Sequence, residues 1–157
     1  MKKENSKTNK SALLLFKENE SNISELYATY AKKIPQKRDF WERLSEEEIA
    51  HAAYINECYM GDYIKSITKN NFSDEIISYL MDFVIKENQR AQTKKTLHRN
   101  AILTALRIER SMLEEKYFEI FTPEASAIKR LFQKLTKETE RHIDILEKEL
   151  IKISNAK

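Results

Sequence analysis

Apolar residues recur along most of this chain at alternating steps of three and four, the spacing of one face of an α-helix. The pattern predicts four long helices, at about residues 11–33, 40–67, 95–121 and 122–153. Residues 1–10 lack this pattern and are rich in Lys, Asn and Ser, so they are predicted to form a disordered tail. The remaining residues, 11–157, are then expected to form one helical domain.

Proline and capping residues mark where these helices begin and end. Pro35 closes the first helix, and Asp39 with Glu42 can form a capping box at the start of the second. Thr122 followed by Pro123 reads as a helix start, with Thr as the cap and Pro at the first helical position.

The connection between the second and third long helices is too long for a hairpin. Residues 70–73 break the apolar pattern, and Ser73 can cap a short helix that carries the apolar residues of 76–84. A connection of this length favours a crossover that runs along the bundle. The predicted fold is therefore all-α: a four-helix bundle with a long crossover, carrying a short helix, between helices 2 and 3.

Composition narrows the class of protein. With one Gly and two Pro in 157 residues, long uninterrupted helices are permitted. A net charge of +3 does not indicate nucleic-acid binding, and no apolar run is long enough to span a membrane. Cys58 is the single cysteine, which excludes an intrachain disulfide and a multi-cysteine metal site. We expect a cytoplasmic protein without a nucleic-acid or membrane partner.

Charged and polar residues interrupt the apolar stripes of all four long helices. These residues are Glu20 on the first helix, Glu48 and His51 on the second, Glu109 on the third and His142 on the fourth. A carboxylate in a core is very costly unless it is paired, protonated or bound to a metal. Glu48 and His51 lie one turn apart on one face, so they can bind the same ion. Carboxylates with two imidazoles in a helical bundle are the ligands of a di-iron site, and they suit iron or manganese.

In the order of these motifs, the chain resembles the ferritin-like superfamily and, within it, the rubrerythrin-type proteins. The first helix has Glu20 followed seven residues later by Tyr27, as in the family's opening helix. The segments 44–52, Leu-Ser-Glu-Glu-Glu-Ile-Ala-His-Ala, and 105–109, Ala-Leu-Arg-Ile-Glu, are similar to its second and third. The resemblance covers the chain from about Ser11 onward.

The resemblance implies a non-haem iron protein in which a reduced di-iron centre reacts with peroxide or dioxygen. Iron is the expected metal, as two ions if the site is complete or as one, with manganese or zinc as alternatives. Many proteins of this type carry a four-cysteine iron domain that supplies electrons. Because this chain has one cysteine, an external donor such as a rubredoxin-like protein is expected. A homodimer is also expected.

One position departs from the family pattern. When residues 135–142 are aligned on residues 44–51, Thr139 falls where the second Glu-x-x-His motif needs its bridging Glu. Two divalent ions bring four positive charges, whereas Glu20, Glu48 and Glu109 supply three negative ones. A hydroxide, an exogenous anion or the neighbouring Glu138 would complete the balance. One ion with a protonated carboxylate satisfies the same residues.

These observations leave several functions open. The first is the peroxide- or dioxygen-reducing oxidoreductase. The second is a ferritin-like bundle with an incomplete or lost metal site that serves as a binding or structural module, and Thr139 is its main support. Iron storage is a weaker third, because a basic chain (pI about 8.8) offers little acidic lining to collect iron. His98, near the start of the third helix, is expected to be structural or exposed.

Overall fold

The computed structural model describes residues 2–60, 67–69, 74–114, 121–123 and 126–156, and these are almost wholly helical. The helices are α1 (Lys2–Lys33), α2 (Arg38–Met60), α3 (Asp74–Thr93), α4 (His98–Glu114) and α5 (Ser126–Asn155), with a short 3-10 turn at Pro35–Lys37. Two three-residue strands, β1 (Ile67–Lys69) and β2 (Phe121–Pro123), pair antiparallel with Ile67 opposite Pro123. The predicted all-α class is confirmed, with this small strand pair as the one addition in the described residues, and α1, α2, α4 and α5 fit a four-helix bundle.

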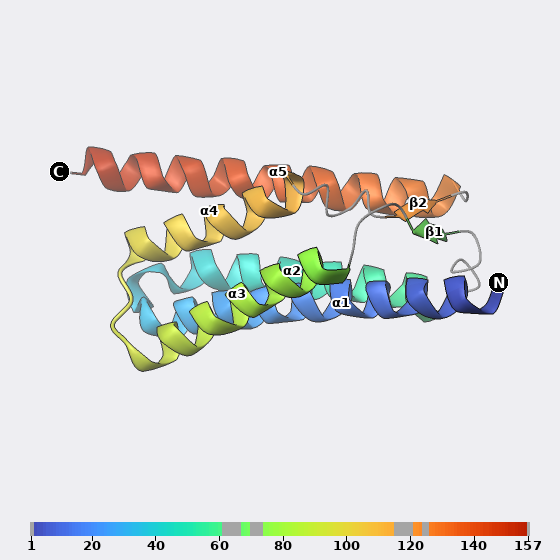
Figure 1. The fold of residues 1–157 in the computed structure, drawn as a ribbon. Helices are drawn as coiled ribbons and strands as arrows, with labels where there is room; N and C mark the ends of the chain where they lie inside the picture. The colour runs from blue at the N-terminus through green and yellow to red at the C-terminus, as the bar shows by residue number, and fades with distance from the viewer. Residues whose placement is uncertain (1, 61–66, 70–73, 115–120, 124–125, 157) are drawn as a thin grey trace.

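The α1–α2 hairpin forms one side of the molecule, and α4 with α5 forms the other (Figure 1). Pro35 cannot continue a helix, so the chain turns there within one 3-10 turn. The turn is held by hydrogen bonds from the Ile34 amide to the Tyr30 carbonyl and from the Lys37 amide to the Ile34 carbonyl, each 2.9 Å long. Helix α3 lies along α1 (Figure 1).

Helix α3 is longer than the short helix predicted between the second and third long helices. It continues through the polar residues after Val84 and ends at Thr93. Ile77, Val84 and Ala91, spaced by seven, are buried, while Tyr79 and Ile85 between them are exposed. A narrow apolar stripe of this kind is enough to hold a helix against its neighbour, so the polar residues remain helical on the solvent side.

Three predicted boundaries differ from the structure. Helix α1 begins at Lys2 rather than after a disordered tail, because residues 1–33 contain no Gly or Pro to stop it. Helix α2 ends at Met60, next to the chain's single Gly, rather than at Ile67. Thr122 and Pro123 lie in strand β2 and not at a helix start, and α5 begins at Ser126. The predicted end of the third helix, at 121, follows residues outside the described part of the chain.

The core is formed by the stripes that the sequence predicts. It combines aromatic residues of α1 and α2 with aliphatic residues of all five helices. Trp41 is fully buried, and its ring centroid lies 4.8 Å from that of Tyr30 and 5.5 Å from that of Tyr27. This packing fixes α1 against α2 beside the polar residues described next. Among the described helices, none has the length and apolar character needed to cross a membrane.

Candidate metal centre

The structure brings together the five core-stripe residues that the sequence singles out. Each has an exposure of 1% or less, and together they come from α1, α2, α4 and α5: Glu20, Glu48, His51, Glu109 and His142. They form two groups of three whose ligand atoms lie within 4.8 Å of one another. We refer to these five residues as the metal centre.

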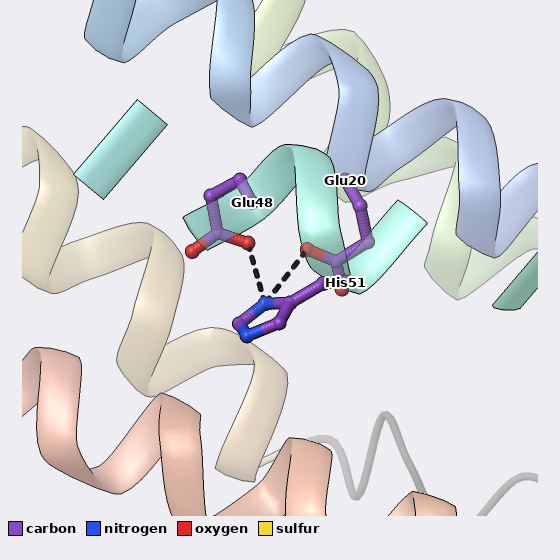
Figure 2. A group of neighbouring side chains, drawn as sticks. All are labelled: Glu20, Glu48 and His51. Atoms are coloured by element: carbon purple, nitrogen blue, oxygen red, sulfur yellow. Dashed lines mark hydrogen bonds and ion pairs between the residues drawn. The ribbon is translucent and has the colours of Figure 1, made fainter. Parts of the chain in front are cut away.

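The first group consists of Glu20 of α1 with Glu48 and His51 of α2 (Figure 2). His51 Nδ1 lies 2.9 Å from Glu48 Oε2 and 4.0 Å from Glu20 Oε2. Glu48 and His51 meet because their spacing of three residues is slightly less than one helical turn. Glu20 reaches them from the neighbouring helix of the α1–α2 hairpin, so this group is set by local packing.

The second group consists of Glu48, Glu109 of α4 and His142 of α5. His142 Nδ1 lies 2.8 Å from Glu48 Oε1 and 3.4 Å from Glu109 Oε1. Glu48 therefore belongs to both groups and faces each with a different carboxylate oxygen. This is the geometry of a carboxylate that can bridge two ions.

The two imidazoles make matching contacts with Glu48 and with a carboxylate of the opposite helix. Their rings stack with centroids 5.5 Å apart, and each turns its Nδ1 atom toward Glu48. Their outer nitrogens contact carboxylates of the opposite helix: His51 Nε2 lies 2.5 Å from Glu138 Oε2, and His142 Nε2 lies 2.7 Å from Glu47 Oε2. A carboxylate that accepts the Nε2–H proton fixes the ring and leaves Nδ1 available as a metal ligand.

Glu138, predicted as a substitute metal ligand, lies on the outer side of His51. It contacts Nε2, whereas the metal-facing nitrogen is Nδ1, and it is not a member of either group of three. Sequence reasoning missed the matching role of Glu47. The signal was present, because Glu47 and Glu138 both precede an inward-facing His by four residues. Since their partners are on opposite helices, the spacing alone could not reveal the cross-pairing.

Thr139 is buried, with an exposure of 1%, at the position equivalent to Glu48. Its hydroxyl donates a hydrogen bond of 3.0 Å to the Leu135 carbonyl of the same helix. The hydroxyl is thus satisfied within α5, as is common for Thr in a helix. The two halves of the centre therefore differ: α2 contributes a carboxylate and α5 a neutral side chain.

Tyr27 adds a further asymmetry. Its hydroxyl donates a 2.7 Å hydrogen bond to Glu109 Oε1, and this orients the carboxylate. Burial raises the pKa of Tyr27 well above its ordinary value, with a further contribution from the Glu109 charge, so the phenol stays protonated and acts as a donor. Tyr117, the other tyrosine considered from the sequence, lies outside the described residues.

Three buried carboxylate oxygens of the centre lack a hydrogen bond within the described part of the chain: both oxygens of Glu20 and Oε2 of Glu109. Glu48 Oε1 and His142 Nδ1 instead face each other as an ion pair at 2.8 Å. Leaving such atoms unsatisfied costs about 1–3 kcal/mol each. All three belong to carboxylates of the two groups described above. An ion bound there would satisfy them together, and oxygen and imidazole donors suit iron, manganese or zinc.

The electrostatics also fit a cation. Burial, followed by the Glu48 charge, raises the pKa of Glu20 well above its ordinary value, and the same two effects raise that of Glu109. Burial also opposes ionisation of Glu48, but contacts with His142 and His51 outweigh it and lower its pKa. His142 is affected in the opposite direction: although burial disfavours its charge, Glu109 and Glu48 raise its pKa to about 11. Without an ion, the centre thus relies on protons to balance its charge.

A second Glu–His pair forms a separate cluster near the α1–α2 turn. The Trp41 Nε1–H group donates to His98 Nδ1 at 3.2 Å, so His98 carries its proton on Nε2. That proton is donated to Glu149 Oε1 at 2.9 Å, and Lys37 Nζ donates to the same oxygen at 2.6 Å. We call these four residues the His98 cluster. Both nitrogens of His98 are engaged, which places it in a structural role.

No known protein family matches the chain, and neither a curated protein nor a solved structure shows significant similarity to it.

Proposed function

We propose that this protein is a rubrerythrin-like non-haem iron protein that reduces peroxide or dioxygen with electrons from an external donor. One observation carries the proposal: the two oxygens of the buried Glu48 face two His-containing groups. The helical architecture supports it, since the four bundle helices and α3 are compatible with a ferritin-like bundle in which α3 belongs to the crossover.

Each residue of the centre has a defined task in this proposal. Glu48 would bridge two ions, with Glu20 and His51 as ligands on one side and Glu109 and His142 on the other. Tyr27 orients Glu109 through its hydroxyl. Glu138 and Glu47 hold the imidazoles by their outer nitrogens. Bound iron would supply the redox chemistry.

Burial of the centre limits what can react there. The five residues are almost inaccessible to solvent, so the chain admits small reactants such as peroxide or dioxygen more readily than bulky ones. Because the five residues are buried, bulk water would be excluded from ions bound there, and this would strengthen the electrostatic interactions within the centre. The single cysteine of the chain cannot provide a four-cysteine iron site, which supports an external donor.

The test is to load the metal-free protein with Fe(II) without oxygen, measure iron per chain by elemental analysis and then follow peroxide consumption. The proposal expects tightly bound iron and peroxide-dependent oxidation that a reductant reverses. Glu149→Gln is the matched control, because it alters a buried carboxylate beside His98, outside the metal centre. Absence of bound iron, or bound iron inert to peroxide and dioxygen, would refute the proposal.

A second function is favoured by Thr139: a helical bundle that no longer performs metal chemistry and acts as a binding or structural module. The neutral, internally satisfied threonine removes the carboxylate that would complete the second half of the centre. In that case, purified protein would contain no stoichiometric metal, and its melting temperature would not change when iron is added.

A further inference from the structure

A cavity of about 350 Å³ lies away from the metal centre, where the end of α3, the start of α4 and Tyr30 of α1 meet. Its volume is within the range of small-molecule sites, about 300–1,000 Å³. Tyr30, Ala91 and Ala101 are 2%, 4% and 1% exposed and belong to the buried core beneath it. The two alanines leave room that larger side chains would fill.

Basic side chains dominate the lining of this cavity. Arg90, Lys94 and Lys95 all line it, and Glu87 is the one carboxylate among the lining residues. Glu87 compensates little of this charge, because its Oε1 is 3.8 Å from Arg90 Nη1 and the Arg90 side chain is 67% exposed. Three cationic groups against one anionic group leave a local excess of positive charge. Such an excess attracts anions.

The start of α4 adds to this preference. The Ala101 amide donates to the Leu97 carbonyl at 3.0 Å, which places Leu97 at the position that precedes the helix. A leucine has no oxygen with which to cap the first amides of the helix. The positive end of the helix dipole is therefore not offset by the Leu97 side chain, and it favours a negative group nearby.

The cavity also has apolar walls that are open to solvent. Leu97 and Leu103 line it and are 54% and 40% exposed. Both are among the large apolar residues that the described part of the chain leaves exposed. A ligand with an aliphatic body would cover them, at a gain of about 25 cal/mol for each Å² of apolar surface removed from water.

We infer that this cavity binds a small organic anion, a short-chain aliphatic carboxylate. The carboxylate would be held by Arg90, Lys94 and Lys95, and the aliphatic body would pack against Leu97 and Leu103. The inference does not depend on the function proposed for the metal centre, because none of its residues belongs to the cavity lining.

The test is calorimetric titration of the full chain, with and without iron, at constant ionic strength. The probes are hexanoate, inorganic phosphate and hexylammonium. Hexanoate should bind at one site, at least about tenfold more tightly than either of the others, since each alternative lacks the apolar or the anionic half. If phosphate binds as tightly as hexanoate, the apolar residues do not contribute to binding. If hexylammonium binds as tightly, the site does not select for negative charge. Absence of hexanoate binding would overturn the whole inference.

Variants then locate the site. Arg90→Gln and Lys94→Gln should each weaken hexanoate about tenfold, as expected for loss of one charge-assisted contact, and Leu103→Ala should weaken it several-fold. These residues are exposed at the surface, and circular dichroism can verify that each variant folds. The control is Lys148→Gln, on α5, whose side chain is 68% exposed and does not line the cavity. A Lys148→Gln effect as large as that of Lys94→Gln would show non-specific binding and overturn the assignment.

Discussion

Two histidine–glutamate clusters in this bundle differ in whether the protein itself provides hydrogen-bond partners for all of their buried polar atoms. In the His98 cluster, Trp41 and Glu149 satisfy both nitrogens of His98, and Lys37 neutralises the carboxylate. In the metal centre, both oxygens of Glu20 and Oε2 of Glu109 lack a hydrogen bond from the described residues. In the His98 cluster, the protein itself supplies a partner for each imidazole nitrogen and for the Glu149 carboxylate. The metal centre leaves buried carboxylate oxygens that a bound ion could satisfy, which is why the metal-binding proposal concerns this cluster and not the His98 cluster.

The largest expected effect follows from replacing the shared ligand. Glu48→Gln removes the charge that faces both imidazoles while it preserves the side-chain shape. Metal affinity should fall by more than about 100-fold, since both ions lose a ligand and loss of an outer contact alone typically costs about 10–100-fold. Metal titration followed by elemental analysis measures this. Wild-type metal affinity in Glu48→Gln would contradict the role of Glu48 as a shared ligand and the distinction between the metal centre and the His98 cluster.

The next effect distinguishes the two halves of the centre. Glu138→Ala should lower the affinity for the ion nearer His51 by about 10–100-fold, because Glu138 orients the His51 ring through Nε2. Thr139→Glu should instead strengthen the site nearer His142 and raise bound iron toward two per chain. Iron stoichiometry at increasing chelator concentration separates these outcomes. A lack of effect of both substitutions would contradict the assigned roles of α5.

Lowering the pH should change the stability of the metal-free protein, and the two clusters should contribute with opposite signs. Burial and the Glu48 charge raise the pKa of Glu20 and Glu109, so the folded state binds these protons more tightly than the unfolded chain. Their protonation stabilises the metal-free fold as pH falls through these raised values toward the ordinary glutamate value of about 4.5. Its melting temperature should therefore rise as the solution is acidified from about pH 8 toward pH 5, the interval above that ordinary value. A melting temperature that falls over this interval would contradict the conclusion that the pKa values of Glu20 and Glu109 are raised in the folded protein.

The His98 cluster should show the reverse sign and a smaller effect. Although burial opposes its ionisation, hydrogen bonds from Lys37 and His98 lower the pKa of Glu149. Its contribution is present above the ordinary glutamate value and is lost as pH falls through the lowered one. Glu149→Gln should reduce the free energy of unfolding by about 1–3 kcal/mol, the cost of disrupting a charged hydrogen bond, and leave iron content unchanged. Chemical denaturation with metal analysis tests both parts.

The sequence identifies the residues that converge in the core, because each of them can be recognised on its own helix. Glu20 and Glu109 are charged residues on apolar stripes, and Glu48 with His51 adds a one-turn spacing, so each helix indicates its own contribution. Their convergence requires only that the stripes face a common core. The cross-pairing of Glu47 with His142 depends instead on how α2 and α5 are placed, which no local pattern encodes.

The predicted elements were less accurate where local signals compete. Thr122 and Pro123 combine a cap with a proline, yet they pair with β1, because an edge strand also tolerates a proline that donates no hydrogen bond. The polar residues at the end of α3 are helical in the structure, although the sequence does not predict a helix there. The helix is held in this region by the contact of Ala91 with the core, which the local sequence does not reveal. In both cases tertiary contacts outweighed local preference.

The central claim is that Glu48 joins two metal-binding groups, and anomalous X-ray diffraction from crystals of the iron-loaded protein tests it most directly. The account predicts an iron peak beside Glu48 Oε2, near Glu20 and His51, and a second, weaker peak beside Glu48 Oε1, near Glu109 and His142. In Thr139→Glu crystals the second peak should approach the first in height. Iron bound elsewhere, with Glu48 still paired directly to both imidazoles, would contradict the account.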